Sequence, residues 1–90
     1  MFDAIQYIEG LKDYVILHVD NKRIVTLQTM KSLEQKLPAD IFMRIHRSYI
    51  INLRNIQMLE GNCVHINQKI IPVGKNYKET LLEVINRNRL

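Results

Sequence analysis

The sequence has little of what metal sites, secreted proteins and membrane spans require. Its 90 residues include one cysteine, three glycines, two prolines and no tryptophan. Uninterrupted apolar runs reach four residues at most, so no segment is long enough to span a bilayer. Cys63 has no second cysteine with which to form a disulfide, and residues 1–20 lack the basic start and apolar core of a signal peptide. We therefore expect a cytoplasmic protein without membrane contact.

Patterns for metal binding and catalysis are also missing. Cys63 and His65 alternate along an expected strand and so share a face, but a structural zinc site needs four ligands in compact pairs. Ser48 follows His46 by two residues with no evident orienting carboxylate, and no glycine-rich phosphate loop is present. We expect no cofactor, no metal ion and no enzymatic activity.

Composition and charge indicate one small folded domain spanning residues 1–90. Hydrophobic residues make up 47% and charged residues 24%, which is typical of a globular chain. The net charge is +4, and its cations cluster: residues 41–59 hold three arginines, and residues 61–78 three lysines, with no acid in either stretch. These stretches could form a positive face for phosphate, or they could be scattered solvated charges.

Short strands dominate the expected secondary structure. Runs rich in Ile, Val and Tyr between turn residues predict strands at 3–9, 13–19, 23–28, 43–45, 55–59, 62–67 and 69–73. Thr29 is expected to cap a short helix that Pro38 stops, and a last helix is expected over about 75–86. Residues 47–54 fit a connection or a single helical turn. The prediction is a mainly β fold with one short and one C-terminal helix.

The segment 42–54 (FMRIHRSYIINLR) interleaves polar side chains with apolar anchors. Arginine offers a planar fork that fits phosphate oxygens or the edge of guanine, so Arg47, beside Ser48 in an expected loop, is assigned to nucleic-acid contact. For His46 and Asn52 we favour a structural role, in which their side chains fix backbone groups of an irregular turn.

Four stretches of the chain together resemble the LytTR-type DNA-binding domain of bacterial response regulators (the LytR/AlgR family). They are AIQYIEGLKDYVILHV, RIVTLQTMKSLEQKLP, FMRIHRSYIINLRNI and KIIPVGKNYKETLLEVI, in the family's order. The resemblance implies small antiparallel sheets that present loops, rather than a recognition helix, to the major groove of double-stranded DNA. It also implies an output domain of a two-component transcription regulator that binds paired repeats as a homodimer.

The family's site residues carry over by position onto three loops. The base-facing places fall on Lys12 and Asp13 beside Leu11, on Arg47 in the HRS turn, and on Lys75 and Asn76 before the last helix. Plausible phosphate neighbours are Arg44, Ser48, Lys69 and Lys78. This chain has Gly74, Lys75 and Asn76 where the family often shows a serine and two basic residues, so its sequence preference is expected to differ.

Two further expectations concern partners. The resemblance implies that a family strand before Asp3, and a receiver or sensor domain before that, lie outside these ninety residues. A different class of function is a protein-interaction or dimerisation module, in which an exposed strand edge recruits a partner by strand addition. A missing first strand would leave such an edge open.

Overall fold

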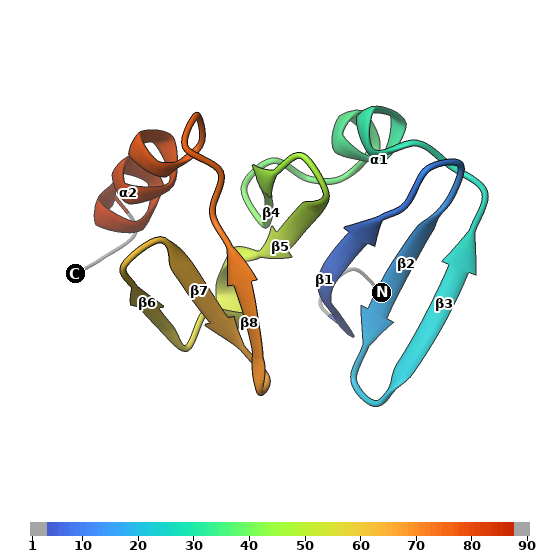
Figure 1. Ribbon diagram of the computed structural model, residues 1–90, viewed down its shortest axis with the longest axis horizontal. Helices are drawn as coiled ribbons and strands as arrows, with labels where there is room; N and C mark the ends of the chain where they lie inside the picture. Colours follow the sequence, from blue (N-terminus) through green and yellow to red (C-terminus); the bar gives the residue numbers. More distant parts are fainter. Residues whose placement is uncertain (1–3, 88–90) are drawn as a thin grey trace.

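The computed structural model describes residues 4–87 and shows eight strands and two α-helices (Figure 1). In chain order they are β1 Ile5–Gly10, β2 Val15–Val19, β3 Lys22–Thr26, α1 Met30–Lys36, β4 Phe42–His46, β5 Tyr49–Asn52, β6 Met58–Glu60, β7 Cys63–Ile66, β8 Lys69–Pro72 and α2 Lys78–Arg87. A 3-10 turn, Leu53–Asn55, follows β5. The predicted mainly β class with a short and a C-terminal helix is confirmed.

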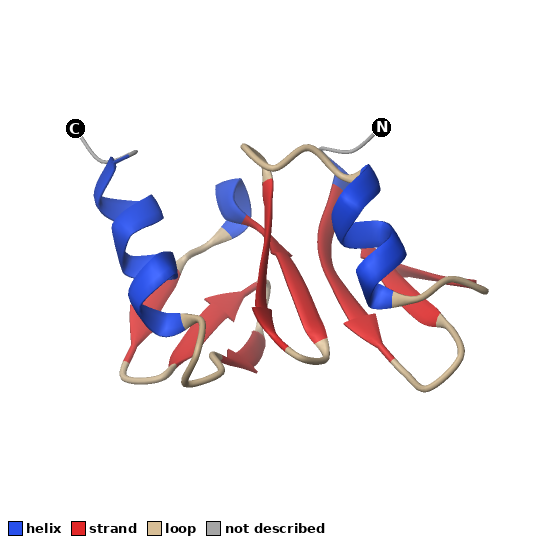
Figure 2. Ribbon diagram, turned by 90° about the horizontal axis from the view of Figure 1, so that it is seen from above, coloured by secondary structure: helices blue, strands red, loops and turns tan. Residues whose placement is uncertain are grey.

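The strands form two small antiparallel sheets (Figures 1 and 2). The larger sheet has the order β3-β2-β1-β5-β4, and the smaller sheet has the order β6-β7-β8. Helix α1 lies over one end of the larger sheet, and α2 lies beside the smaller one. Within residues 4–87, no helix is long and apolar enough to cross a membrane.

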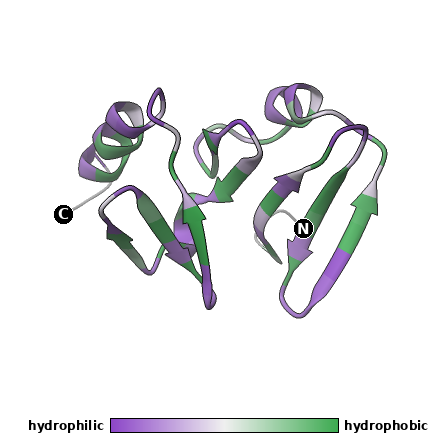
Figure 3. Cartoon of the chain, in the orientation of Figure 1, coloured by the Kyte–Doolittle hydropathy of each residue, from purple (hydrophilic) through white to green (hydrophobic). Residues whose placement is uncertain are grey.

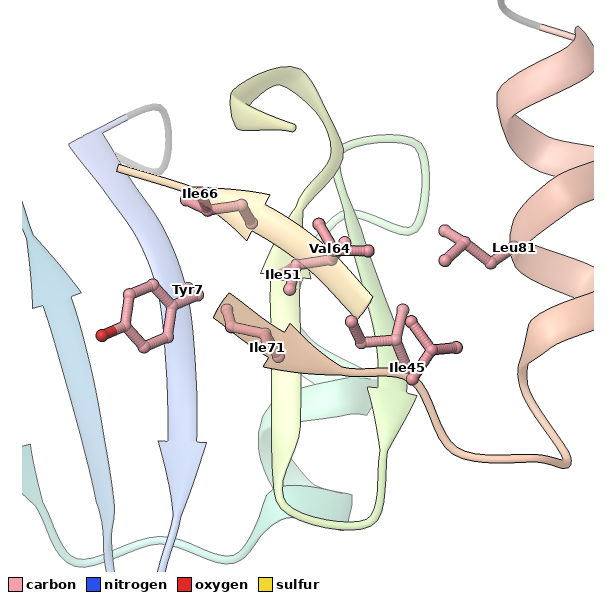
Figure 4. Close-up of a cluster of buried hydrophobic side chains, with 8 residues drawn as sticks. Tyr7, Ile45, Ile51, Val64, Ile66, Ile71 and Leu81 are labelled. Carbon is pink, nitrogen blue, oxygen red and sulfur yellow. The ribbon is translucent and has the colours of Figure 1, made fainter. Parts of the chain in front are cut away.

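Two hydrophobic cores lie on opposite faces of the larger sheet. One joins it to α1 through Ile8, Val15, Met30, Leu33, Leu37, Phe42 and Ile50. The other joins it to the smaller sheet and α2 through Tyr7, Ile45, Ile51, Val64, Ile66, Ile71, Val73 and Leu81 (Figure 4). Sequence neighbours are therefore divided between the cores: Tyr7 and Ile8 on β1, and Ile50 and Ile51 on β5.

The interpretation of residues 47–54 was wrong for Tyr49–Asn52. This segment forms β5, which pairs with both β1 and β4 inside the larger sheet. Because both faces of β5 are covered, Ile50 and Ile51 are both buried, and the alternation that marks a half-exposed strand is absent. The helical turn exists only at Leu53–Asn55, and β6 begins at Met58 rather than at residue 55.

Other local predictions are confirmed with shifted ends. The Thr29 hydroxyl accepts a hydrogen bond from the Ser32 N–H at 3.0 Å, which caps α1 as expected. The last helix begins at Lys78, because residues 74–77 form a turn in which the Tyr77 N–H donates to the Gly74 carbonyl. Asp3, the predicted first residue of the opening strand, lies outside the described residues.

Candidate nucleic-acid interface

Three connections that are far apart in the sequence lie along one edge of the molecule. They are the β1–β2, β4–β5 and β8–α2 turns, which we call the loop edge. All three lie along the upper side of Figure 1 and the lower side of Figure 2. The β2–β3 and β7–β8 turns lie at the opposite ends of their strands. The loop edge therefore gathers all three predicted DNA-contacting loops.

Each turn of the loop edge places a cation and then a shorter polar residue at its tip. In the first turn, the Leu11 N–H donates to the Tyr14 carbonyl at 2.9 Å. In the third, the Tyr77 N–H donates to the Gly74 carbonyl at the same distance, and the middle turn is closed by the pairing of His46 with Tyr49. The residue pairs at the tips are Lys12-Asp13, Arg47-Ser48 and Lys75-Asn76, all exposed except the half-buried Ser48.

Main-chain hydrogen bonds tie the middle turn to both of its neighbours. The Gly10 N–H, at the start of the first turn, donates to the Ser48 carbonyl at 2.7 Å. The Gly74 N–H, at the start of the third, donates to the Ile45 carbonyl, also at 2.7 Å. Because main-chain bonds between adjacent elements leave little freedom, the spacing of the three tips is set by the fold.

The middle turn has an uncommon conformation for a two-residue hairpin connection. Such turns usually need a positive φ at one or both central residues, whereas neither Arg47 nor Ser48 has one. The pairing of β4 with β5 shifts register between Arg44 and His46. Side chains support the turn: His46 Nδ1 accepts from the Ser48 N–H at 3.0 Å, and Arg44 donates from Nη2 to the Arg47 carbonyl at 2.7 Å.

The remaining predicted phosphate neighbours are placed differently. Arg44 is half-buried on β4 and also contacts Glu34 of α1, with Nη1 3.2 Å from Oε1. Lys78 begins α2 beside the third turn, and its Nζ donates to Asn62 Oδ1 at 2.7 Å. Lys69 begins β8 at the end away from Gly74, so the structure does not bring it to the loop edge.

Asn52 makes the contacts of a residue that fixes the backbone. It is 1% exposed at the end of β5, its Nδ2 donates to the Ile5 carbonyl at 2.9 Å, and its Oδ1 accepts from the Arg54 N–H at 2.9 Å. The amide thus joins β5 to the start of β1 and caps the 3-10 turn. It lies at the end of β5 opposite the middle turn.

The chemistry of the loop edge suits an extended polyanion better than a small molecule. Its three cations stand on protruding turns, and Asp13 is the only acid at the tips. Among residues 4–87 no group of three or more His, Cys, Asp or Glu side chains is arranged to hold a metal ion. Protruding turns that carry Lys, Arg, Asn and Asp can enter a groove and meet both phosphates and base edges.

Comparison with known protein families also indicates binding to a nucleic acid. The family model of the LytTr DNA-binding domain matches residues 1–86. The chain belongs to the LytTR DNA-binding domain family. Its loop edge is therefore the candidate DNA interface of a LytTR domain, and the family is one of DNA-binding rather than catalytic domains.

Similar proteins come from bacterial signalling systems. The chain is 33% identical over 73 residues to the sensory transduction protein LytT of Enterococcus faecalis. This match covers 74% of this chain and 30% of the relative. It is 29% identical over 89 residues to LytT of Bacillus anthracis, and this match covers 92% of this chain and 36% of the relative. The chain thus spans about a third of the length of the curated relatives that it matches.

A solved structure has the same fold. It is described as the LytTr DNA-binding domain of a methyl-accepting/DNA response regulator from Bacillus cereus, with a TM-score of 0.86 and 20% sequence identity. The match covers 93% of this chain and 83% of the other. The arrangement of two small sheets and two helices is therefore that of a LytTR domain.

Sequence reasoning missed the contacts through which three residues shape the loop edge. Arg44 was assigned to phosphate, but its guanidinium also donates to main-chain carbonyls of the middle turn. Glu34 was not singled out, although it contacts Arg44 from α1. Gly74 approaches Ile45 and Tyr77 so closely that a Cβ would lie 2.9 Å from the Tyr77 ring. The sequence gives no signal for these contacts because they depend on how distant segments pack.

Proposed function

We propose that this LytTR domain binds double-stranded DNA sequence-selectively by inserting the loop edge into the major groove, as the output domain of a transcription regulator. The observation that supports this most is the shared design of the three turns. Each presents a cation followed by a short polar residue, and main-chain bonds hold the turns beside one another. One edge thus offers three separate points of contact to a single groove.

The tip residues have side chains that match base edges. Arg47 can donate two hydrogen bonds to O6 and N7 of guanine, and Asn76 can pair in the same two-bond manner with adenine. Asp13 would repel phosphate, but its carboxylate can accept from the amino group of cytosine. Lys12 and Lys75 can reach either guanine or phosphate, because an ammonium group is a compact charge on a flexible stem.

Phosphate contacts would come from the residues around these tips. Ser48 at the middle turn and Lys78 at the start of α2 lie beside the proposed base contacts, whereas the Arg44 guanidinium donates to the Arg47 carbonyl and contacts Glu34. Neutralising phosphates releases counterions, so affinity should fall steeply as salt rises. Lys69 lies at the other end of β8, so its predicted phosphate contact is not part of the interface proposed here.

We propose that two copies act together on paired repeats. A single module of this size buries roughly 600–1,000 Å² on DNA, which gives limited selectivity. Two domains on spaced half-sites would add their contacts, as in other dimeric DNA-binding proteins. A receiver or sensor domain elsewhere in the regulator would supply the signal.

Selection of bound sequences from a random duplex pool tests the proposal. The wild-type domain should enrich a recurring motif, whereas Arg47→Ala should lose preference at one base of that motif and bind it about 1–3 kcal/mol more weakly. Weakening by the same factor on every sequence would show that Arg47 contacts only phosphate. Failure of the wild type to enrich any motif would contradict sequence-selective binding.

A second candidate function is strand addition at β3. This edge strand is half-buried only at Thr26, and its C-terminal half is apolar (Figure 3). Val25 is 60% exposed and Leu27, just after the strand, is 83% exposed. An exposed apolar edge can pair with a strand of a partner. Salt-insensitive self-association that Val25→Lys abolishes, without binding to duplex DNA, would favour this function over the first.

A further inference from the structure

Arg44 connects helix α1 to the middle turn of the loop edge. Its Nη2 donates to the Arg47 carbonyl at 2.7 Å, and its Nε donates to the His46 carbonyl at 3.3 Å. Its Nη1 lies 3.2 Å from Glu34 Oε1 on α1. The side chain is only 21% exposed, whereas that of Glu34 is 48% exposed. Most of the guanidinium is thus directed at the protein.

We infer that Arg44 is a positioning residue for Arg47: it sets the direction of the Arg47 side chain and thereby the base preference of the middle turn. This inference rests on the proposed DNA-binding function. It differs from the phosphate contact that the sequence predicts for Arg44, because it assigns the effect to the turn and not to the charge.

The backbone of the turn explains why such support is needed. Neither Arg47 nor Ser48 takes the positive φ that matches a two-residue turn to the twist of its strands. By contrast, the β7–β8 turn has positive φ at both central residues, Asn67 and Gln68, at 45° and 66°. The middle turn therefore depends on bonds from outside itself, and Arg44 satisfies two of its carbonyls.

Lysine at position 44 separates the two roles. It keeps the positive charge, so a phosphate contact would largely survive. It has a single nitrogen in place of the planar fork, so it cannot hold the two carbonyls and Glu34 together. Arg23→Lys is the matched control, because Arg23 is exposed on β3 beside the β2–β3 turn, away from the loop edge.

The test compares four proteins on a panel of duplexes that differ at the base read by Arg47. These are the wild type, Arg44→Lys, Arg47→Ala and the double variant, alongside the Arg23→Lys control. We expect Arg44→Lys to reduce discrimination at that base by about tenfold, within the roughly 5- to 150-fold range of one base contact. The slope of log affinity against log salt should stay as in the wild type, because no charge is lost.

The double variant decides whether the two arginines act together. In the Arg47→Ala background, Arg44→Lys should change base discrimination no further, since the side chain that it positions is gone. An unchanged base preference in Arg44→Lys would overturn the inference. An equal effect in the presence and absence of Arg47 would do the same, because it would place Arg44 in an independent contact.

Amide hydrogen exchange in the free protein gives a readout that needs no DNA. The Gly10 N–H, bonded to the Ser48 carbonyl, should exchange about tenfold faster in Arg44→Lys if the turn loosens, while core amides such as that of Leu81 keep their wild-type rates. If the wild type shows no base preference, the proposed function fails, and this measurement alone decides the role of Arg44. Unchanged exchange at Gly10 would then overturn the inference.

Discussion

The main-chain N–H of Gly74 lies 2.7 Å from the carbonyl oxygen of Ile45 and donates a hydrogen bond to it. This bond ties the turn before α2 to the end of β4, next to the turn that carries Arg47. With the bond from Gly10 to Ser48 on the other side, it makes one continuous edge from three separate connections.

Gly74→Ala should disturb both the fold and DNA binding. The added Cβ would lie 2.9 Å from Tyr77 Cδ2 and 3.5 Å from the Ile45 carbonyl, so the Tyr77 ring or the third turn that carries it must shift. We expect a loss of about 1–3 kcal/mol in the free energy of unfolding, as for other overpacked sites. Duplex affinity should fall as well, because Lys75 and Asn76 are displaced. Urea unfolding and fluorescence anisotropy with a labelled duplex measure the two effects.

Gly61→Ala is the matched control for this change. Gly61 has a φ of +60°, so alanine there is strained by about 1 kcal/mol, but the space around it is open and it lies in the β6–β7 turn. It should lower stability without changing duplex affinity beyond what unfolding explains. Equal losses of affinity in both variants would contradict the role of the Gly74 contact.

Lys75→Ala should weaken binding through a lost charge. We expect affinity to fall on all duplexes and the slope of log affinity against log salt to decrease by about one, if Lys75 contacts a phosphate. Lys22→Ala removes the same charge at the start of β3, away from the loop edge, and should leave the slope unchanged. Equal changes of the salt slope in Lys75→Ala and Lys22→Ala would contradict a phosphate contact specific to Lys75.

Asn52→Ala should destabilise the fold strongly, because the Asn52 side chain is buried and hydrogen-bonded. It removes the buried amide, so that the Ile5 carbonyl loses this donor and the Arg54 N–H loses this acceptor, and we expect a cost of about 1–3 kcal/mol in the free energy of unfolding. Asn21→Ala removes an exposed amide in the β2–β3 turn, at a residue without a positive φ, and should cost about 0.5 kcal/mol or less. Thermal unfolding of both variants checks the difference.

The surroundings of Tyr7 predict that the free energy of unfolding decreases at alkaline pH. Burial, reinforced by the nearby charge of Glu9, raises the pKa of its phenol above the ordinary value of 10.0. The protonated form is therefore favoured in the folded state. The stabilisation that the protonated phenol gives the folded state is complete below pH 10.0 and is lost as pH rises through the higher folded pKa.

Tyr7→Phe tests this pH dependence. The ring also stacks on His18, with centroids 4.1 Å apart and planes 15° apart, and phenylalanine can keep that contact. The free energy of unfolding should fall less steeply above pH 10.0 in the variant than in the wild type. Identical slopes in urea titrations at several alkaline pH values would show that Tyr7 is not the group responsible.

Arg47→Ala is the prediction most directly tied to base recognition. Arg47 stands exposed at the centre of the middle turn, between the two bonds that join the loop edge. Its removal should cost about 1–3 kcal/mol on the preferred duplex and relax preference at one base. Competition between the preferred duplex and variants changed at single positions measures this loss.

Much of the local structure could be predicted because it depends on neighbouring residues. Thr29 as a helix cap and Pro38 after α1 each act within a few positions, and the structure bears them out. The strand β5 could not be predicted, because Ile50 and Ile51 are buried by elements far away in the sequence.

In the candidate site, too, some features could be predicted from the sequence and others depend on distant segments. Family motifs carried Lys12, Arg47 and Lys75 onto three loops, and the fold brings these loops to one edge. The support from Arg44 and Glu34, and the close approach at Gly74, arise only when α1, β4 and the third turn meet. Side chains that recognise a ligand leave a sequence signal, whereas those that hold a turn by long-range contacts leave little.

The account is tested most directly by following the amide NMR signals of the labelled domain as its selected duplex is added. We predict that the largest shifts fall on residues 11–13, 46–48 and 74–78, the three turns and the start of α2. Residues 20–23 and 67–70, at the opposite ends of the strands, should be nearly unaffected. Shifts concentrated on those two segments, with the three turns unchanged, would contradict the claim that the loop edge is the DNA-binding surface.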